Sequence, residues 1–478
     1  MVSVRQTWWV LWASVGIWSA AAQDTRPNIL VLLADDLAPD GIRAWGNREV
    51  HTPNLDRLVE RGLSFVQAYI QGSWTPAVCI ASRAMLMSGQ PLWRAQAEVR
   101  TRARSQTTWP QLLRAAGYFT AATGKWHVPG AQPEQLFETT VRITAGMPRD
   151  ERHWYGRPVE GQPDPFCPWD PTAGGYWQGG RHWSEVQADD AIELIRTAST
   201  GSRPWFLYIA FNAPHDPRQS PKEFVDLYPP DQLQLPSNFR PSHDPDDAIG
   251  LGPKLRDEQL APFPRTPYAI RHHRREYYAI ISHLDAQIGR ILAALDATRP
   301  TRPTWIFFSS DNGLAVGRHG LMGKQNMYQH SIRVPMVVVG PGVPSNRVCR
   351  APVYMQDLTA TILELAGVGV PRDWYWQSLT PFFRDPDRRG RDALYGAYLT
   401  FQRMVTDGTW KLVLYPPVRQ ARLFNLAEDP DELHDRSDDP VARLHGQRLV
   451  RRLLELQKET GDDLDLTRAV PEWLNVND

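Results

Sequence analysis

Five continuous apolar runs mark the first three quarters of the chain, and polar or amphipathic segments separate them. The runs span residues 28–34, 118–123, 204–211, 304–309 and 334–340. Such runs are typical of strands that are buried on both faces of a parallel sheet. Helical patterns lie between them, at residues 53–62, 109–116, 184–196, 274–295 and 357–366. The pattern predicts an α/β fold with a large, mostly parallel central sheet sandwiched by helices.

The pattern changes near residue 373. Short apolar stretches joined by turns follow, at residues 393–400, 403–406 and 410–415. An amphipathic helix is expected at residues 441–461, after this group of strands. We therefore expect a main domain over residues 23–372 and a smaller C-terminal subdomain over residues 373–478, built from an antiparallel sheet and a helix.

The N-terminus has the features of a secretory signal peptide over residues 1–22. Arg5 supplies the positive charge, and the apolar run from Trp8 ends in three alanines before Gln23. The run is short for a transmembrane helix, and no other stretch is apolar enough to span a bilayer. The sequence predicts export to the periplasm or the medium, without a stable membrane anchor.

The composition indicates which kinds of molecule the protein binds. The 53 basic and 53 acidic residues cancel, so no basic excess favours nucleic acid. Several of the 19 tryptophans fall in residues 131–180, a long segment that resembles a loop. Loops of this length in a compact domain are usually functional. Exposed aromatic side chains there would suit sugar rings, and ordinary packing is the alternative.

Cys79 and Arg83 form the most informative short motif. A run of good helix formers follows them and stops at Gly89, which puts Cys79 near the N-terminus of a helix. Free N–H groups there favour an anion and lower a thiol pKa. Arg83 rises from the same helix face and would point at the same oxyanion. The alternative is a buried structural cysteine beside a surface arginine.

Carboxylates follow two of the predicted strands. Asp35 and Asp36 end the run at 28–34, and Asp311 and Asn312 end the run at 304–309. Ligands of open α/β sheets lie beyond the carboxyl ends of the strands, and adjacent carboxylates repel each other without a cation. Oxygen ligands suit Ca²⁺ or Mg²⁺ better than zinc. A solvated turn is the alternative.

Cationic and proton-active residues follow the other strands. Lys125 and His127 share one face of an extended chain after the run at 118–123, His215 follows the run at 204–211, and Lys324 lies beyond Asp311. A metal ion surrounded by such groups is a site for a sulfate or phosphate ester.

The chain resembles the formylglycine-dependent (type I) sulfatases, relatives of alkaline phosphatase. The stretches that carry the resemblance are RPNILVLLADD, HTPNLDRL, CIASR, GKWH, NAPHDP, SSDNG, GLMGK, SIRVPM and RLFNLAEDPDE. They cover nearly the whole chain after residue 22. The resemblance implies a sulfuric ester hydrolase whose catalytic domain is residues 23–372.

The resemblance also implies the chemistry of the nucleophile. Cys79 would be oxidised to formylglycine (3-oxoalanine), and one hydroxyl of its hydrate would attack sulfur. Arg83 would hold this hydrate. His127 would take the proton of the second hydroxyl, so that sulfate is expelled and the aldehyde is restored.

Further residues have roles by the same resemblance. Lys125 and Lys324 would bind sulfate oxygens, and His215 would protonate or stabilise the leaving oxygen. The ligands of a calcium ion, with magnesium as the alternative, would be Asp35, Asp36, Asp311, Asn312 and the modified Cys79.

Ala81 departs from the usual Cys-x-Pro-x-Arg motif of the family. The departure leaves open which formylglycine-generating enzyme, the expected partner of the nascent chain, recognises this segment. Three cysteines are an odd number for an exported protein, and pairing of Cys167 with Cys349 would leave Cys79 as the odd thiol.

Three functions remain open at this level. The favoured one is a secreted sulfatase that acts on a sulfated carbohydrate. The second is a formylglycine-dependent phosphodiesterase or phosphonate hydrolase of the same superfamily. The third is a glycan-binding protein in which Cys79 stays unmodified, which the full set of metal and proton-transfer residues disfavours.

Overall fold

The structure, a computed structural model, describes residues 25–101, 108–148, 154–243, 249–466 and 470–471. The predicted signal peptide at residues 1–22 lies outside this part of the chain. Within it, no helix combines the length and the hydropathy needed to cross a membrane.

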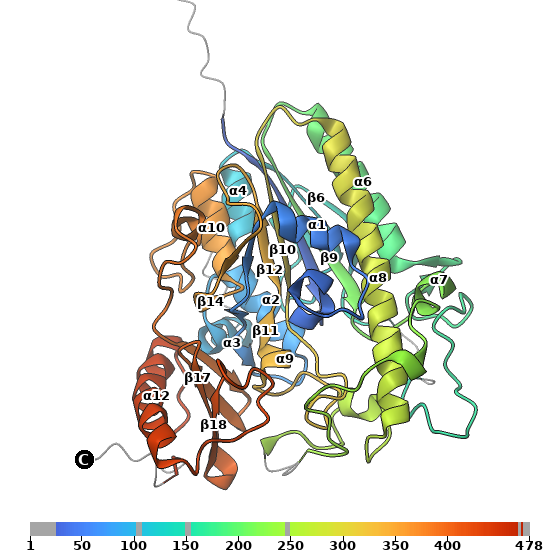
Figure 1. The fold of residues 1–478 in the computed structure, drawn as a ribbon. Helices are drawn as coiled ribbons and strands as arrows, with labels where there is room; N and C mark the ends of the chain where they lie inside the picture. Colours follow the sequence, from blue (N-terminus) through green and yellow to red (C-terminus); the bar gives the residue numbers. More distant parts are fainter. Residues whose placement is uncertain (1–24, 102–107, 149–153, 244–248, 467–469, 472–478) are drawn as a thin grey trace, which may run out of the picture.

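The main domain is built on a sheet of eight strands (Figure 1). In spatial order these strands are β13 (Arg347–Cys349), β2 (Leu63–Phe65), β12 (Met336–Val339), β10 (Thr304–Ser310), β1 (Asn28–Asp35), β9 (Trp205–Pro214), β5 (Phe119–Lys125) and β6 (Thr139–Thr144). Neighbours from β10 to β6 run parallel, and β12 runs antiparallel to β10 and β2. The predicted mostly parallel sheet is confirmed.

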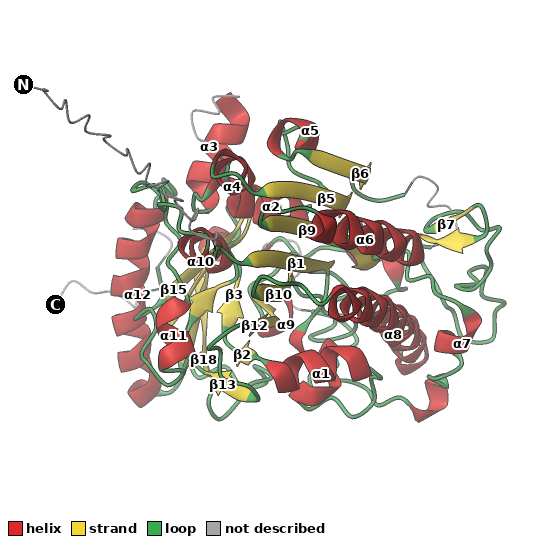
Figure 2. Cartoon of the chain, turned by 90° about the horizontal axis from the view of Figure 1, so that it is seen from above, coloured by secondary structure: helices red, strands yellow, loops and turns green. Residues whose placement is uncertain are grey.

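Helices cover both faces of this sheet (Figures 1 and 2). Alternate residues of β1 enter opposite cores, Ile29 and Val31 on one face and Leu30 and Leu32 on the other. The α-helices among the described residues are α1 (Pro53–Arg61), α2 (Val78–Ser88), α3 (Leu92–Thr101), α4 (Trp109–Ala115), α5 (Pro133–Leu136), α6 (Trp183–Thr200), α7 (Lys222–Val225), α8 (Pro267–Thr298), α9 (Gln329–Ile332), α10 (Asp357–Leu365), α11 (Thr380–Arg384) and α12 (Pro440–Thr460). In Figure 1, α6 and α8 lie on one side of the sheet and α4 and α10 on the other.

A second sheet of five strands carries the C-terminal part. Its order is β18 (Gln420–Asn425), β17 (Trp410–Tyr415), β16 (Gln402–Thr406), β15 (Leu394–Tyr398) and β4 (Gly72–Ser73). The strands from β15 to β18 are antiparallel neighbours, as expected, and α12 packs on them. However, β4 belongs to the main domain and pairs parallel with β15. The domain division at residue 373 therefore stays a prediction.

Short strands complete the fold. They are β3 (Ala68–Tyr69), β11 (Arg333–Val334) and β14 (Val353–Tyr354) in one small sheet, and β7 (Trp177–Gln178) with β8 (Arg181–His182) in another. The apolar run at 334–340 is thus not one strand. Pro335 separates β11 from β12, and the two belong to different sheets.

The loop expected over residues 131–180 is only partly a loop. Helix α5 and strand β6 occupy its start, and β6 extends the central sheet beyond β5. The side chains of β6 are exposed or half-buried, so this edge strand lacks the apolar run that marks the inner strands.

The aromatic side chains of this segment pack against the protein. Trp154, Tyr176 and Trp177 are buried, and Trp169 is half-buried against one of the two cores, as is Trp183 just after the segment. Packing therefore explains these aromatic residues better than stacking on sugars. The three cysteines are all free, so Cys167 and Cys349 are not paired in this structure.

The β4–β15 contact leads to a prediction about stability. A Cβ added at Gly72, which has a φ of 81°, would run into the carbonyl oxygen of Ala397. Gly161 is a matched control, because its φ is 77° and nothing lies within 4 Å of its Cβ position. We expect Gly161→Ala to cost about 1 kcal/mol from its φ alone, and Gly72→Ala to cost a further 1–3 kcal/mol, roughly, from the clash.

Urea unfolding of both variants and the parent protein, followed by tryptophan fluorescence, measures the difference. Equal losses of unfolding free energy for Gly72→Ala and Gly161→Ala would contradict the close contact between Gly72 and the carbonyl oxygen of Ala397.

Candidate active site

The ten residues predicted from the sequence come together at the carboxyl ends of β1, β5, β9 and β10 and at the start of α2. All of them are buried except His127, which is half-buried. These four strands are neighbours in the sheet, so their ends lie along one edge.

Three carboxylates form the centre of the site. Oxygen atoms of Asp35, Asp36 and Asp311 lie within 4.8 Å of one another. Asp36 has a φ of 69°, and its backbone N–H donates to Asp311 Oδ1 at 3.3 Å. Asn312 joins the cluster, because its Nδ2 donates to Asp36 Oδ1 at 2.6 Å.

Two buried oxygens of this cluster lack a donor among the described residues, Oδ1 of Asp35 and Oδ1 of Asn312, whereas Oδ2 of Asp35 pairs with Lys125. A buried acceptor without a donor is costly, whereas a hard divalent cation binds such oxygens directly. The donor set therefore fits Ca²⁺ or Mg²⁺, which Asp35, Asp36, Asp311 and Asn312 could hold.

Three cationic side chains balance the carboxylates. Arg83 Nε donates to Asp311 Oδ2 at 2.7 Å, and Lys324 Nζ donates to Asp36 Oδ2 at 2.7 Å. Lys125 forms an ion pair with Asp35. Burial opposes these positive charges, but the surrounding anionic groups, Asp36 first among them, together raise the pKa of Lys324 well above its ordinary value. All three cations are thus held charged in the interior.

Cys79 is the second residue of α2 and is 2% exposed. Lys125 Nζ lies 3.7 Å from its Sγ. Burial opposes ionisation of the thiol, but Lys125 and Lys324 outweigh it and lower the Cys79 pKa to about 6. The position therefore stabilises negative charge, but through the two lysines and not through the helix N-terminus from which the sequence analysis argued.

The two histidines differ in their surroundings. His127 follows β5 with a φ of 52°, so the extended chain that was expected from Lys125 to His127 ends there. Burial lowers the His127 pKa, which favours a neutral ring that can accept a proton. His215 follows β9. Burial and Lys324 oppose protonation of its ring, but the His215 pKa is raised to about 9, with Asp36 and Asp216 as the largest raising contributions. A protonated His215 can donate to a leaving group.

The His215 ring has a defined orientation. Its Nδ1 donates to the carbonyl oxygen of Asp216 at 2.7 Å, and its Nε2 lies 3.7 Å from Asp36 Oδ2. Nε2 therefore faces the carboxylate cluster. Asp216 was missed as a functional residue, although it lies inside the NAPHDP stretch that signalled His215.

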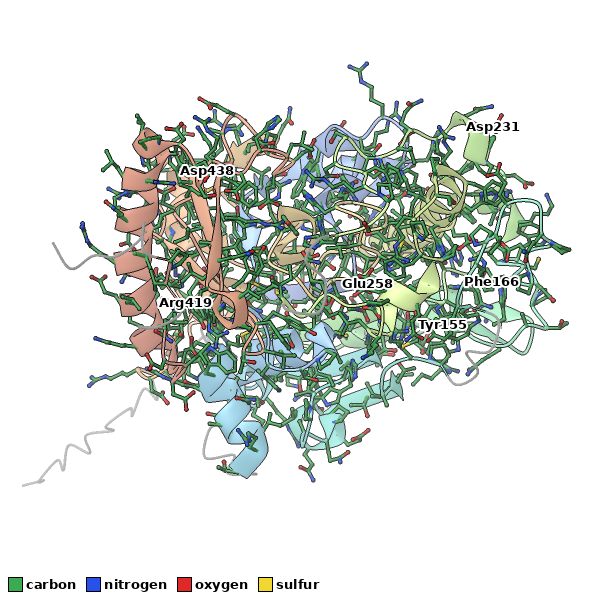
Figure 3. The ribbon with its side chains drawn as sticks, turned by 90° about the horizontal axis from the view of Figure 1, so that it is seen from below. Tyr155, Phe166, Asp231, Glu258, Arg419 and Asp438 are labelled. Carbon is green, nitrogen blue, oxygen red and sulfur yellow. The ribbon has the colours of Figure 1, made fainter. Side chains whose placement is uncertain are left out.

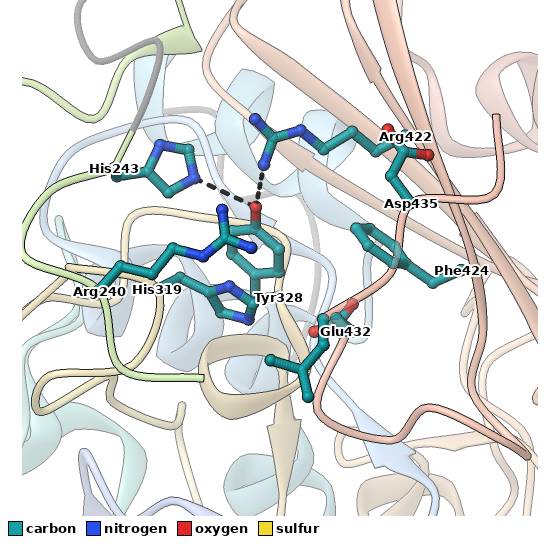
Figure 4. A pocket seen from close by; sticks show the side chains of 9 residues that line it. Arg240, His243, His319, Tyr328, Arg422, Phe424, Glu432 and Asp435 are labelled. Carbon is teal, nitrogen blue, oxygen red and sulfur yellow. Dashed lines mark hydrogen bonds between the residues drawn. The ribbon is translucent and has the colours of Figure 1, made fainter. Parts of the chain in front are cut away.

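A polar cavity of about 230 Å³ lies apart from this site, between the loop that precedes α9 and the C-terminal sheet (Figure 4). The hydroxyl of Tyr328 accepts a hydrogen bond from Arg422 and shares one of 3.1 Å with His243. Glu432, on the same cavity, pairs with Lys411. None of the ten predicted residues lines this cavity.

The sulfatase family model matches residues 27–368 of this chain. A second model, for the C-terminal part of N-sulphoglucosamine sulphohydrolase, matches residues 317–459. The first match spans all ten predicted residues, and the second begins shortly before Lys324.

Known proteins are similar over most of the chain. A choline-sulfatase from Rhizobium meliloti (strain 1021) is 29% identical over 451 residues, which cover 87% of this chain and 83% of the relative. Iduronate 2-sulfatase from Homo sapiens is 29% identical over 343 residues, 66% of this chain and 60% of the relative.

Solved structures share the fold. One protein, described in complex with its substrate D-glucosamine-2-N,6-O-disulfate, has a TM-score of 0.72 at 22% identity and covers 92% of this chain and 99% of its own. A phosphonate monoester hydrolase from Silicibacter pomeroyi also has a TM-score of 0.72, at 20% identity, over 92% and 97% of the two chains. The likeness concerns the fold and leaves the substrate undetermined.

The carboxylate cluster predicts that a divalent cation stabilises the folded protein. We expect added CaCl₂ to raise the thermal midpoint of chelator-treated protein, with a stabilisation of about 2.7 kcal/mol at a hundredfold excess over the dissociation constant. Asp311→Asn should weaken this response, because it removes one of the three charges.

Asp285→Asn is the control for this experiment. Asp285 is equally buried but lies outside the site, where it accepts hydrogen bonds from the N–H groups of Asn54 and Leu55. Its variant should lose stability yet keep the full calcium response. An undiminished response in Asp311→Asn would contradict the assignment of the ligands.

Proposed function

The chain belongs to the sulfatase family of the alkaline phosphatase superfamily and hydrolyses sulfate esters, and we propose that its substrate is a sulfated carbohydrate. The observation that carries the proposal is the match of residues 317–459 to the C-terminal part of N-sulphoglucosamine sulphohydrolase. A sulfated glucosamine is also the substrate of a protein with the same fold.

The proposed nucleophile derives from Cys79, converted to formylglycine by a formylglycine-generating enzyme. The hydrated aldehyde supplies one hydroxyl to attack sulfur and a second through which sulfate is released. The surroundings support this role, because Lys125 lies beside the Cys79 side chain and favours negative charge there. His127, held neutral by burial, accepts the proton of the second hydroxyl.

The sulfate group is bound by positive charge in this proposal. Lys125 and Lys324 contact its oxygens, and each now pairs with a carboxylate of the cluster. Arg83 is fixed by Asp311 and by the carbonyl oxygen of Lys125, so its guanidinium lies between the carboxylate cluster and the end of β5. A calcium ion on the four oxygen ligands would add Lewis acidity at the sulfate oxygens.

The leaving oxygen is served by His215. Its Nδ1 donates to the carbonyl oxygen of Asp216, and its Nε2 faces the cluster. The protonated ring can therefore donate from Nε2 to the leaving oxygen. This matters most for a sugar alkoxide, which is a poor leaving group without protonation.

Export and domain organisation belong to the same proposal. Residues 1–22 would direct the chain to the periplasm or the medium, where sulfated polysaccharides are encountered. Residues 23–372 would form the catalytic domain and residues 373–478 a C-terminal subdomain.

A panel of substrates tests the carbohydrate proposal. Sulfated mono- and oligosaccharides, choline sulfate, an aryl sulfate, a phosphate diester and a phosphonate monoester should be compared at equal enzyme concentration. We expect the highest kcat/KM on a sulfated sugar. A higher value on choline sulfate would reassign the substrate, and one on the phosphorus esters would favour a phosphonate hydrolase or phosphodiesterase.

The nucleophile can be tested by mass spectrometry of active enzyme from its native host. The peptide that contains Cys79 should carry an aldehyde in place of the thiol, whereas the peptide with Cys349 should keep its thiol. Cys79→Ala should abolish turnover and Cys349→Ala should not. Active enzyme with only unmodified Cys79 would rule out this mechanism.

The variants His215→Ala and His127→Ala should lose activity in different ways. General acid catalysis contributes roughly 10²–10⁴-fold, so His215→Ala should slow sugar sulfates by about that factor and an activated aryl sulfate much less. His127→Ala should slow both substrates alike and accumulate sulfated enzyme. Equal losses on both substrates in His215→Ala, with no trapped sulfate in His127→Ala, would show that the roles are assigned wrongly.

A further inference from the structure

We propose that three consecutive residues outside the catalytic set, Arg256, Asp257 and Glu258, act together as positioning residues for His215, the segment before Cys79 and the loop that carries Lys324. They lie at the start of a 3₁₀ helix, Asp257–Leu260, in the proline-rich stretch between β9 and α8. Asp257 and Glu258 are buried. The proposal rests on the functions given above to His215 and Lys324.

Arg256 holds the carboxylate beside His215. Its Nη1 donates to Asp216 Oδ2 at 2.6 Å and its Nη2 to Asp216 Oδ1 at 3.3 Å. Such a bidentate pair fixes the plane of the carboxylate as well as its position. Asp216 Oδ1 is in turn 3.3 Å from His215 Nδ1. Arg256 thereby keeps the His215 ring turned so that Nε2 faces the site.

Asp257 holds an amide that joins two catalytic segments. Gln325 Nε2 donates to Asp257 Oδ2 at 2.8 Å and to the carbonyl oxygen of Pro76 at 3.0 Å. Gln325 Oε1 accepts from the backbone N–H of Lys324 at 3.0 Å. Since Pro76 is three residues before Cys79, one side chain sets the distance between the nucleophile segment and the Lys324 loop.

Glu258 holds the same loop from its other side (Figure 3 labels this residue). Its two carboxylate oxygens accept from the backbone N–H groups of Met322, at 2.9 Å, and Gly323, at 2.8 Å. Arg265 pairs with Glu258 and also donates to the carbonyl oxygen of Gly320 at 3.1 Å. The two residues directly before Lys324 are therefore bound to one buried ion pair.

Gly323 shows how closely the loop approaches this turn. A Cβ at residue 323 would collide with Gln325 Oε1 and lie 2.8 Å from the Asp257 Cβ. Position 323 therefore requires glycine because there is no space for a side chain, and not because of its backbone angles. Three catalytic segments that are distant in the sequence meet a single turn, and small misplacements of catalytic groups cost rate steeply.

The test compares Arg256→Lys with Arg403→Lys. Lysine keeps the charge but loses the bidentate geometry. Arg403 is the control, because it also makes a bidentate pair with an aspartate, Asp462, in the C-terminal part. Arg403 is more deeply buried than Arg256, whose side chain is 32% exposed, so its variant should lose at least as much stability. Both variants should lose thermal stability. Only Arg256→Lys should also lower kcat on sugar sulfates, by roughly 10- to 100-fold, while an activated aryl sulfate is affected far less.

Glu258→Gln tests the other end of the turn. Its amide cannot accept from both N–H groups, so the Lys324 loop should shift and KM should rise roughly tenfold for sugar and aryl sulfates alike, with a smaller change in kcat. This pattern differs from that of Arg256→Lys, as the proposal requires of residues that serve different catalytic groups.

The outcomes separate this inference from the proposed function. Wild-type enzyme that is inactive on all sulfate esters would overturn both. If wild type and His215→Ala behave as described, but Arg256→Lys matches Arg403→Lys on both substrates, the positioning role is overturned and the function stands. A Glu258→Gln variant with unchanged KM would likewise overturn it.

Discussion

Burial of charge at the carboxyl edge of the central sheet is the constraint on which the rest of the structure depends. Three carboxylates and three cations lie there almost without exposure, namely Asp35, Asp36, Asp311, Arg83, Lys125 and Lys324. Removing each ion from water costs several kcal/mol, roughly, so each sign is tolerated only beside the other. These ion pairs form only when β1, β5, β10 and α2 are all correctly placed. The carboxylate oxygens can then bind a cation, and the three positive side chains can bind an anion.

The surrounding elements keep this charged interior in register. On one side, the turn at residues 256–258 contacts the segments that carry His215 and Lys324. On the other side, β4 ties the chain before Cys79 to the C-terminal sheet. The candidate nucleophile is therefore held between two parts of the chain that follow it by nearly two hundred residues or more. Neither contact involves a group that reacts. Both position segments of the site from parts of the chain that are distant in the sequence.

Sequence analysis predicted the inner strands and their polar ends, because continuous apolar runs and the residues after them are local signals. Asp35, Asp311 and His215 were found in this way. The edge strand β6 and the two-residue β4 were missed, since neither has an apolar run. The pairs of Arg256 with Asp216 and of Asp257 with Gln325 span 40 and 68 residues. Only the folded chain reveals such partners, and the φ of 52° at His127 is set by the same tertiary context.

The pairing of β4 with β15 also sets an order of events in time. Ser73 cannot meet its partner Tyr398 until the ribosome has made that residue, and Arg83 must likewise wait for Asp311. At roughly 5–20 residues per second, the chain between residues 79 and 398 takes about 15 to 65 s to synthesise. During this interval the segment around Cys79 lacks the partners that later bury it. Under the proposed maturation of Cys79, the enzyme that modifies this residue would have to act before the last sheet forms.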